Sequence, residues 1–356
     1  MPLPPLIGHE GVKTRLAGAH ASGKLPQALL LAGPRGVGKQ RLALWLAQLI
    51  QCEAPGQEPC GQCRPCRLVL SLQHPDVHWF VPVELSKRGG SGGGDADKQV
   101  ELVAEALAEE MTARREQPLY GPPAGLASHP IATVRLLLRR LALTPAMGTR
   151  KVFIVGEAER LIPQVGTEVA ANALLKALEE PPTDSVIIIT AAEANALLPT
   201  ILSRVVLVRM ARIVDSAVTA FAQQTVGISD KAELAQRVTA ADGCIGKLFA
   251  TVTPRSGQSG GGAGGGGGAE QAARFLDAPL LFALGQVPFQ ARGGFTEMLD
   301  ALADRLRSEA KRGGDTGKLV EAIALVMDAR DSAQGNVNPQ LLAAVLAEDL
   351  QAMRRS

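Results

Sequence analysis

Residues 27–50 read QALLLAGPRGVGKQRLALWLAQLI. A short apolar run ends at Gly33, a glycine-rich loop follows, and an apolar-periodic segment then covers residues 41–50. Gly33, Gly38 and Lys39 have the G-x-x-x-x-G-K spacing of a phosphate-binding loop, in the strand–loop–helix context that this motif requires. The stretch therefore predicts an α/β domain, and the candidate phosphate-binding residues are Gly33, Gly36, Gly38 and Lys39.

The two magnesium-binding positions of such a site hold other residues. The residue after Lys39 should be Ser or Thr, whose hydroxyl helps to hold the magnesium ion of a bound nucleotide, but it is Gln40. A second ligand, an Asp, is expected after a neighbouring strand, yet KVFIVGEAER (151–160) has Gly156 there, followed by Glu157. Because phosphoryl transfer depends on the metal to neutralise developing charge, these two changes argue against hydrolysis. No magnesium is expected, whereas the backbone amides and Lys39 leave residual nucleotide binding open.

Further apolar runs and helical patterns alternate along the first 213 residues. Because strands alternate with helices, we expect a mostly parallel sheet that is covered by helices on both faces. After about residue 213 only helical patterns remain. The expected strands are 77–81, 152–155, 186–190 and 205–209, and the expected helices are 131–143 and 168–180, the second of them stopped by Pro181 and Pro182.

The same pattern predicts the domain organisation. A Gly-rich stretch, SGQSGGGAGGGGGA (256–269), is too poor in side chains to join a core and indicates a flexible linker. A second Gly-rich stretch indicates a mobile insertion in the first domain. The expected parts are an α/β domain (1–212) with an insertion at about 86–98, a small helical domain (213–253), a linker (254–274) and a helical C-terminal domain (275–356).

Composition narrows the classes of function. Hydrophobic residues make up 46% of the 356 residues and aromatic residues only 3%, which favours helix-rich packing of aliphatic side chains. The net charge of +2 is too small to indicate nucleic-acid binding by itself. No apolar run approaches the ~20 residues of a membrane span, and the start, MPLPPLIGHE, does not resemble a secretory signal. We therefore expect a cytoplasmic protein with reduced thiols and no membrane partner.

Four of the five cysteines have the spacing C-x7-C-x2-C-x2-C within residues 51–67. The C-x2-C steps let thiolates converge on one tetrahedral ion, and four sulfur ligands leave no open position for a substrate water. The spacing predicts a structural zinc site. Two disulfides are an alternative that a reducing compartment disfavours, and an iron–sulfur cluster is a weaker one because the C-x3-C-P ending is missing. The four residues are Cys52, Cys60, Cys63 and Cys66; Cys244 stands alone in a helical context, typical of a small buried residue.

Several segments resemble, in the same order, bacterial clamp-loader subunits of the AAA+ class. They are the phosphate loop, the four cysteines, residues 151–161, NALLKALEEPP (172–182) and LPTILSR (198–204). The resemblance covers about the first 210 residues, and it is less distinct in the helical domains, where NPQLL (338–342) resembles the end of the family's collar domain. In this family the ATPase subunits keep the hydroxyl and the Asp, whereas the delta-prime branch has lost them. The chain resembles that branch.

The resemblance implies an AAA+ P-loop domain with a zinc module, a small helical lid domain and a helical collar for oligomerisation. It implies a non-hydrolysing stator subunit of the DNA polymerase III clamp loader, a hetero-oligomer that works in DNA replication. The implied partners are the gamma/tau ATPase subunits, the delta subunit and, through the complex, the sliding clamp and primed DNA. Arg204, next to Ser203, would then act as an arginine finger in the neighbouring ATPase subunit. The alternatives are a catalytically active gamma/tau-type ATPase subunit and an unrelated zinc-containing P-loop enzyme.

Other positions depart from the family's ATPase pattern or have a simpler interpretation. The lid's sensor arginine would fall in GCIGK (243–247), where Gly246 or Lys247 stands instead. The polar sensor after the fourth strand is Thr190 or Ala191. One helical pattern carries arginines at i, i+4 and i+5, for which a solvated helix face is preferred over a phosphate-facing patch. These are Arg135, Arg139 and Arg140.

Overall fold

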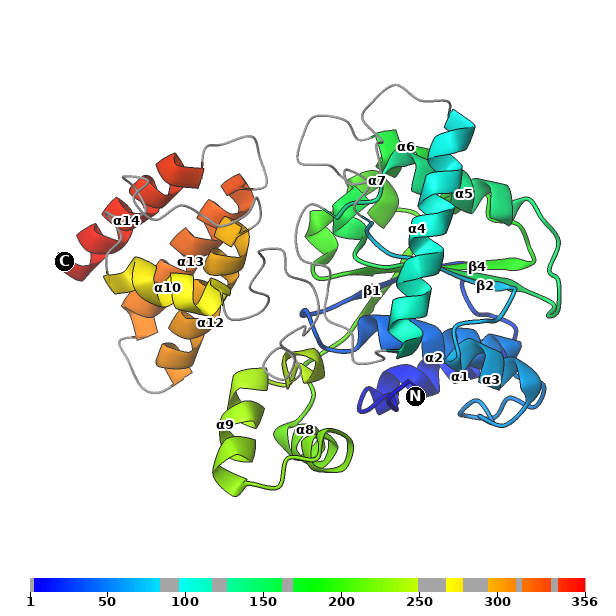
Figure 1. Ribbon diagram of the computed structural model, residues 1–356, viewed down its shortest axis with the longest axis horizontal. Coiled ribbons are helices and arrows are strands. Elements are labelled where there is room, and N and C mark those ends of the chain that lie inside the picture. Colours follow the sequence, from blue (N-terminus) through cyan, green and yellow to red (C-terminus); the bar gives the residue numbers. More distant parts are fainter. Residues whose placement is uncertain are drawn as a thin grey trace. The chain divides into compact units, whose positions relative to one another are not determined.

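The computed structural model describes residues 3–83, 96–116, 127–161, 169–248, 267–277, 294–311, 316–333 and 339–355. Most of the expected insertion at 86–98 lies outside these residues, and so does the Gly-rich stretch expected at 256–269 except for its last three residues. The described residues up to 248 form one compact unit, and those from 267 onward form a second. Figure 1 shows the first unit as an α/β domain with a small group of helices, and the second as a helical bundle.

A five-stranded sheet forms the centre of the first unit. Its strand order is β2-β3-β4-β1-β5, and every pair of neighbouring strands is parallel. The prediction of a parallel sheet from alternating strands and helices is therefore confirmed. The strands are β1 (Ala28–Ala32), β2 (Val77–Phe80), β3 (Lys151–Val155), β4 (Ser185–Ala191) and β5 (Val206–Arg209).

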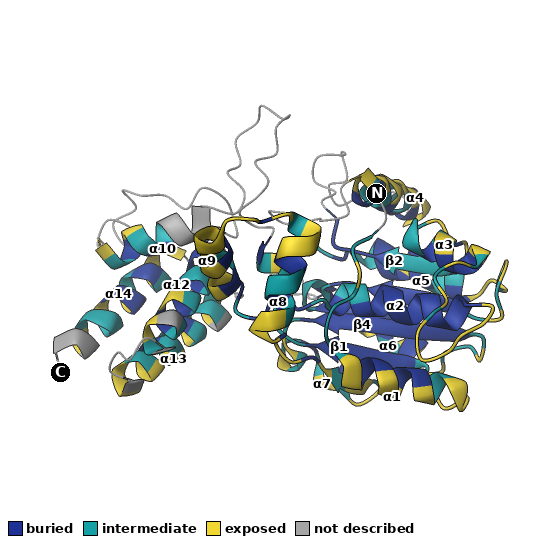
Figure 2. Cartoon of the chain, turned by 90° about the horizontal axis from the view of Figure 1, so that it is seen from below, coloured by how far each residue is buried: buried dark blue, intermediate teal, exposed yellow. Residues whose placement is uncertain are grey.

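Successive residues of β1 belong to two different cores, because side chains alternate across a sheet. Leu30 packs in one core with helices α4, α5 and α6, whereas Leu29 and Leu31 pack in the other with α1, α2 and α3. Figure 2 shows the buried strands and the buried residues of α2 in dark blue. The helices are α1 (Glu10–Ala21), α2 (Lys39–Gln51), α3 (Arg64–Leu70), α4 (Ala96–Glu116), α5 (Ile131–Leu141) and α6 (Val169–Glu179).

Helix α4 is an element that the sequence patterns did not predict. It begins in the last residues of the stretch expected to be an insertion. Val100, Val103 and Leu107 are buried and join the core on the α5–α6 face, and Arg114 near the end of the helix is also buried. The chain that follows the expected surface insertion therefore forms a helix that packs in the domain core.

A small helical part follows β5 within the first unit. Its helices α8 (Asp215–Phe221) and α9 (Lys231–Ala241) enclose a separate core that contains Val218, Phe221 and Val238. The Asp230 side chain accepts a hydrogen bond from the Glu233 backbone N–H at the start of α9, as N-cap residues do. No strand occurs after β5 among the residues that the structure describes.

The second unit consists of helices packed around one apolar core. Phe275, Met298, Leu302 and Val326 are among its buried residues. Its first helix begins inside the segment expected to be linker up to residue 274, because Ala272 and Phe275 supply apolar side chains to the core. The described helices are α10 (Gly267–Asp277), α12 (Gly294–Lys311), α13 (Thr316–Ala333) and α14 (Pro339–Arg355). Across the described residues, no helix combines the length and apolarity needed to cross a bilayer.

Candidate functional site

The phosphate loop connects the carboxyl end of β1 to the amino end of α2. Gly36 and Gly38 have φ values of 82° and 106°, a left-handed backbone that glycine adopts without strain. The Lys39 ammonium donates to the backbone oxygens of Gly33 and Pro34, at 2.6 and 2.9 Å. Burial lowers the pKa of Lys39 to about 8, although the Glu159 carboxylate acts in the opposite direction. The loop has the predicted form, and its lysine binds the loop's own carbonyls.

Gln40 and Gly156, the two residues in place of the metal ligands, lie against each other. A Cβ atom added to Gly156 would be 3.1 Å from the Gln40 Nε2, so the amide occupies the space beside the glycine. The Gln40 Oε1 accepts a hydrogen bond of 3.2 Å from Arg114, whose side chain is buried. Arg114 also pairs with Glu110 and lies over the Trp79 ring at 4.3 Å. An amide and a guanidinium therefore fill the space beside the two positions at which the sequence pattern of a P-loop ATPase calls for magnesium ligands.

Glu157, the acidic residue directly after Gly156, is also engaged. The Glu157 carboxylate pairs with Arg160 at 3.1 Å, and its backbone has a φ of 52°. Its backbone N–H donates to the Thr190 hydroxyl at 3.1 Å. Thr190 is fully buried, so the polar residue at the end of β4 is held inside the fold by Glu157. Neither side chain is directed to an open metal site by these contacts.

The small helical part contacts the phosphate loop directly. The Gly246 N–H donates to the Gly36 oxygen at 2.8 Å, and a Cβ on Gly246 would be 2.7 Å from the Gly36 Cα. Only glycine permits this close approach of two backbones. Gly246 is one of the two residues expected in place of a sensor arginine, and here it forms a backbone contact with the loop tip.

Arg204 lies between α7 (Pro199–Leu202) and β5, beside the end of α6. Its Nε and Nη2 are 3.0 and 2.8 Å from the same oxygen of Glu179. Its Nη1 donates to the Thr200 carbonyl and to the Ser203 hydroxyl, at 2.9 and 3.0 Å. A third of the Arg204 side chain is exposed. The two residues that the sequence singled out, Arg204 and Ser203, are thus in contact.

The strand register places Arg204 far from the loop of its own chain. Val206 at the start of β5 pairs with Leu29 near the start of β1, whereas the phosphate loop follows the end of β1. Because β1 is five residues long and a strand rises ~3.3 Å per residue, the two sites are separated by about one strand length, roughly 13 Å or more. They occupy opposite edges of the sheet, so Arg204 is not placed to act on a nucleotide in its own loop.

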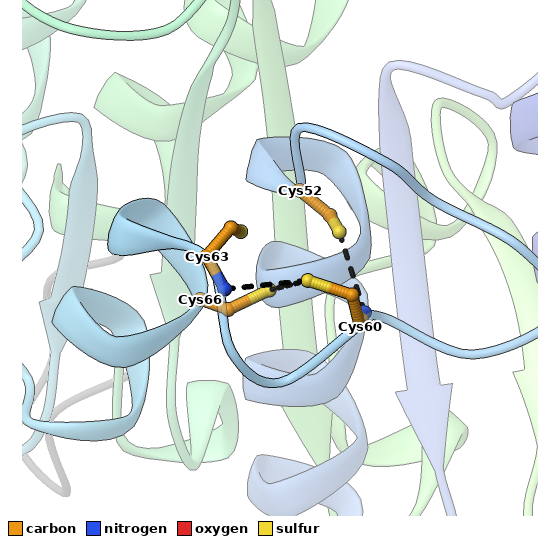
Figure 3. Close-up of side chains that lie close together, drawn as sticks. All are labelled: Cys52, Cys60, Cys63 and Cys66. Atoms are coloured by element: carbon orange, nitrogen blue, oxygen red, sulfur yellow. Dashed lines mark hydrogen bonds between the residues drawn. The ribbon is translucent and has the colours of Figure 1, made fainter.

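The four cysteines of the predicted metal site meet beside the end of α2. Cys52 follows α2, Cys63 precedes α3 and Cys66 lies in the first turn of α3, while Cys60 comes from the loop between the helices. Figure 3 shows the four side chains converging. All four sulfur atoms lie within 4.8 Å of one another, and those of Cys60 and Cys66 are 3.9 Å apart. A tetrahedral ion with Zn–S bonds of about 2.3 Å requires sulfur separations of about 3.8 Å. The cluster could hold a metal ion.

Backbone amides around the cluster favour the thiolate form that a metal requires. The N–H groups of Cys63 and Gln62 lower the pKa of the Cys60 thiol to about 6, and the Cys60 N–H donates to the Cys52 sulfur at 3.3 Å. Burial acts in the opposite direction and raises the pKa of the Cys52 and Cys66 thiols. Between the cysteines, the Glu58 carboxylate accepts hydrogen bonds from Lys13 of α1 and Trp45 of α2, at 2.9 and 2.5 Å. The cysteine loop is therefore fixed to two helices of the domain. None of the five cysteines forms a disulfide.

The other residues singled out from the sequence have structural surroundings. Arg139 pairs with Asp97 of α4, and Arg140 lies half-buried over the Phe80 ring, whereas Arg135 is exposed. The three arginines therefore do not form one phosphate-facing patch. Cys244 is fully buried in the core on the α2 face.

Sequence reasoning missed the partners of the key side chains. Arg114 lies 74 residues from Gln40 and Glu179 lies 25 residues from Arg204, so no local spacing relates the two members of either pair. Glu179 belongs to the segment NALLKALEEPP (172–182), which resembles the family, but that segment does not indicate which side chain the carboxylate contacts.

Comparison with known proteins relates the chain to replication proteins. It is 33% identical over 177 residues to DNA polymerase III subunit delta' of Haemophilus influenzae, and 32% identical over 181 residues to that of Bacillus subtilis. These matches cover 50% and 51% of this chain but only 40% and 41% of the relatives. The tau subunit of Bacillus subtilis is 27% identical over 200 residues, which are 56% of this chain and 27% of that protein.

A solved gamma subunit-related protein of Thermotoga maritima aligns with 98% of this chain and all of that chain, at 15% identity. Its TM-score of 0.39 is too low to support an argument about the fold. The family model described as "DNA polymerase III, delta subunit" matches residues 8–213, which is more than half of the chain and includes the phosphate loop, the four cysteines and Arg204. The chain therefore belongs to this DNA polymerase III subunit family, and both delta' and tau subunits are among its relatives.

Proposed function

We propose that the chain is a non-hydrolysing delta-prime subunit of a DNA polymerase III clamp loader. Its partners are the gamma/tau ATPase subunits and the delta subunit, and the complex loads the sliding clamp on primed DNA for replication. The names of its relatives supply the complex, and the site geometry supports the division of roles within it. In this assignment the chain is a component of the polymerase holoenzyme and has no ATPase activity of its own.

The observation that carries the proposal is the contact between Gln40 and Gly156. An active ATPase would need an oxygen ligand for magnesium at each position, but the Gln40 amide lies beside the glycine and is held there by buried Arg114. Restoring one ligand would leave the other side of the site filled. This arrangement favours the stator over an active gamma/tau-type ATPase subunit.

In this proposal Arg204 acts on the nucleotide bound by the neighbouring ATPase subunit. A guanidinium placed at the γ-phosphate in a neighbouring ATPase subunit stabilises charge on the transferring group, an effect worth about 10³–10⁵ in rate in comparable hydrolases. The location of Arg204 at the sheet edge opposite its own phosphate loop fits action on a neighbour. Ser203 holds one side of the guanidinium through its hydroxyl.

The test is a reconstituted loader that contains Arg204→Ala or Arg204→Lys. We expect assembly and metal content to stay at wild-type values, while DNA-stimulated ATPase falls in part and clamp loading falls further. Lysine should not restore the rate fully, because one ammonium lacks the planar fork that engages two phosphate oxygens. Exposed Arg209 on β5 is the matched control, and Arg209→Ala should behave as wild type. Wild-type rates for both Arg204 variants would refute the finger.

We infer that the cysteine cluster binds one structural zinc ion through Cys52, Cys60, Cys63 and Cys66. A bound ion would cross-link the loop that Glu58 fixes to α1 and α2, so it would stabilise the domain and take no part in chemistry. Metal analysis should find one zinc per chain, and Cys60→Ser should reduce zinc content and lower the melting temperature. Cys244→Ser, outside the cluster, should keep the zinc. An unchanged zinc content in Cys60→Ser would refute the site.

The helical unit from residue 267 is proposed as the collar through which the subunit joins the loader, and residues 213–253 as the lid. The collar assignment rests on the resemblance of the chain's C-terminal part to the family's collar, and the helical bundle agrees with that role. A chain that ends before residue 254 should then fail to co-purify with the gamma/tau subunits. Normal co-purification of the truncated chain would refute this role.

A further inference from the structure

We propose that Glu179 holds Arg204 in the free subunit and releases it to a phosphate of the neighbouring subunit's nucleotide. Glu179 is then a positioning residue that sets how readily Arg204 engages. The inference rests on the proposed function and adds to it a residue whose contact with Arg204 must be broken during assembly.

The Arg204 guanidinium uses donors on both of its sides for contacts within its own chain. The Nε and Nη2 atoms form one edge of the guanidinium, and both face the same Glu179 oxygen, at 3.0 and 2.8 Å. On the other side, Nη1 donates to the Thr200 carbonyl and to the Ser203 hydroxyl. A bidentate grip on phosphate uses two parallel N–H donors of one guanidinium edge. That grip therefore requires Arg204 to leave Glu179 or Ser203 and Thr200.

The contacts of Arg204 differ in how far they oppose its action on a phosphate. The Glu179 carboxylate is the charged acceptor, and it compensates the positive charge that would stabilise a neighbour's transition state. The contacts of Thr200 and Ser203 are neutral and hold the guanidinium without reducing its charge. Separation from Glu179 is thus the change that makes the full charge of Arg204 available to a phosphate.

The ion pair between Glu179 and Arg204 is well positioned but weak. Glu179 is the last residue of α6, which is anchored by buried Leu174 and Leu178, so the carboxylate is presented from a fixed helix end. The pair is nevertheless accessible to water, because 33% of the Arg204 side chain and 49% of the Glu179 side chain are exposed. Exposed ion pairs are weak. The contact can therefore orient Arg204 in the free subunit and still yield to a phosphate carrying more charge.

The adjacent residue Glu180 provides a matched control, because it is also exposed and lies next to Glu179 in the same E-E-P-P run. In the isolated full-length chain, the Nε–H signal of Arg204 can be followed by NMR and assigned with Arg204→Lys. We expect Glu179→Gln to shift this signal and speed its exchange with water, and Glu180→Gln to leave it unchanged. Equal effects of the two variants, or none from Glu179→Gln, would show that Glu179 does not hold Arg204.

The release is tested by titrating each variant into the other loader subunits with ATP and primed DNA. Because an exposed pair contributes about 0.2–1 kcal/mol, Glu179→Gln should lower the concentration for half-maximal ATPase roughly 1.5- to 5-fold, with the maximal rate unchanged. Glu180→Gln should match wild type. A lower maximal rate, or an unchanged half-maximal concentration, would overturn the release. Wild-type ATPase in Arg204→Ala would instead refute the proposed function, independently of the NMR result.

Discussion

The phosphate loop and Arg204 lie at opposite edges of one sheet, and their cationic groups are held in different ways. At the carboxyl edge, Lys39 and Arg114 are buried and bind groups of the domain interior. At the amino edge, Arg204 is partly exposed and binds groups at the surface of the domain. A cation on the surface stays available to a neighbouring molecule, whereas a buried one is committed to its own fold. The difference supports a structural role for the first edge and agrees with the interaction role that we propose for the second.

The largest expected effect concerns Lys39 and the pH dependence of stability. The pKa of Lys39 falls from its ordinary 10.5 to about 8 on folding, mainly through burial. Between these values the unfolded chain binds more protons, so the free energy of unfolding should rise as pH rises through about 8 to 10.5. The effect is on the order of 3 kcal/mol.

The measurement is urea unfolding of wild type and Lys39→Met across this pH range. The difference between the two free energies should change through the window, whereas the change Lys24→Met at an exposed lysine should give a curve parallel to wild type. Parallel curves for Lys39→Met would mean that the loop lysine is solvated. The two edges would then differ less than their contacts indicate.

A smaller effect is expected where the small helical part touches the loop. In Gly246→Ala the new Cβ would lie 2.7 Å from the Gly36 Cα, so one of the two backbones must move. We expect a loss of about 1–3 kcal/mol in the free energy of unfolding, as for other overpacked sites. Gly18→Ala in α1 has no atom within 4 Å of its Cβ and should instead stabilise by about 0.5–1 kcal/mol. Stabilisation by both changes would show that the loop and the helices do not pack tightly here.

The smallest expected effect is on ATPase activity after the metal ligands are restored. Gln40→Thr with Gly156→Asp supplies a hydroxyl and a carboxylate, but it also removes an acceptor from buried Arg114. The isolated chain should still show no ATP turnover above background, because no neighbouring subunit supplies an arginine to its loop. The lost acceptor should lower the free energy of unfolding by about 1–3 kcal/mol. Turnover that disappears when Lys39→Ala is added would contradict this. The loop of the wild-type chain would then lack nothing but its two metal ligands. The difference between the two edges of the sheet would come down to the side chains at positions 40 and 156.

Much of the fold followed from local patterns. Short apolar runs between helical patterns predicted the parallel sheet, and the strands observed begin and end within a residue or two of those expected. Helix α4 was missed because its beginning adjoins a Gly-rich stretch that indicated an insertion. The first eight residues of helix α10, 267–274, were assigned to the linker for the same reason, although Ala272 is a core residue. The composition of a Gly-rich stretch does not predict the structure of the residues next to it, because helices there can be stabilised by tertiary packing.

The sequence by itself determined the elements whose chemistry depends on neighbours in the chain. The phosphate loop, the cysteine spacing and the exchange of both magnesium ligands can be identified from residues a few positions apart. Only the tertiary structure decided what these groups contact. It showed that Gln40 meets Gly156 and Arg114, that Gly246 touches Gly36, and that Glu179 pairs with Arg204. Spacing along a helix or loop is fixed by backbone geometry, whereas a pair of side chains from distant segments meets only after the sheet register and the helix packing have been set.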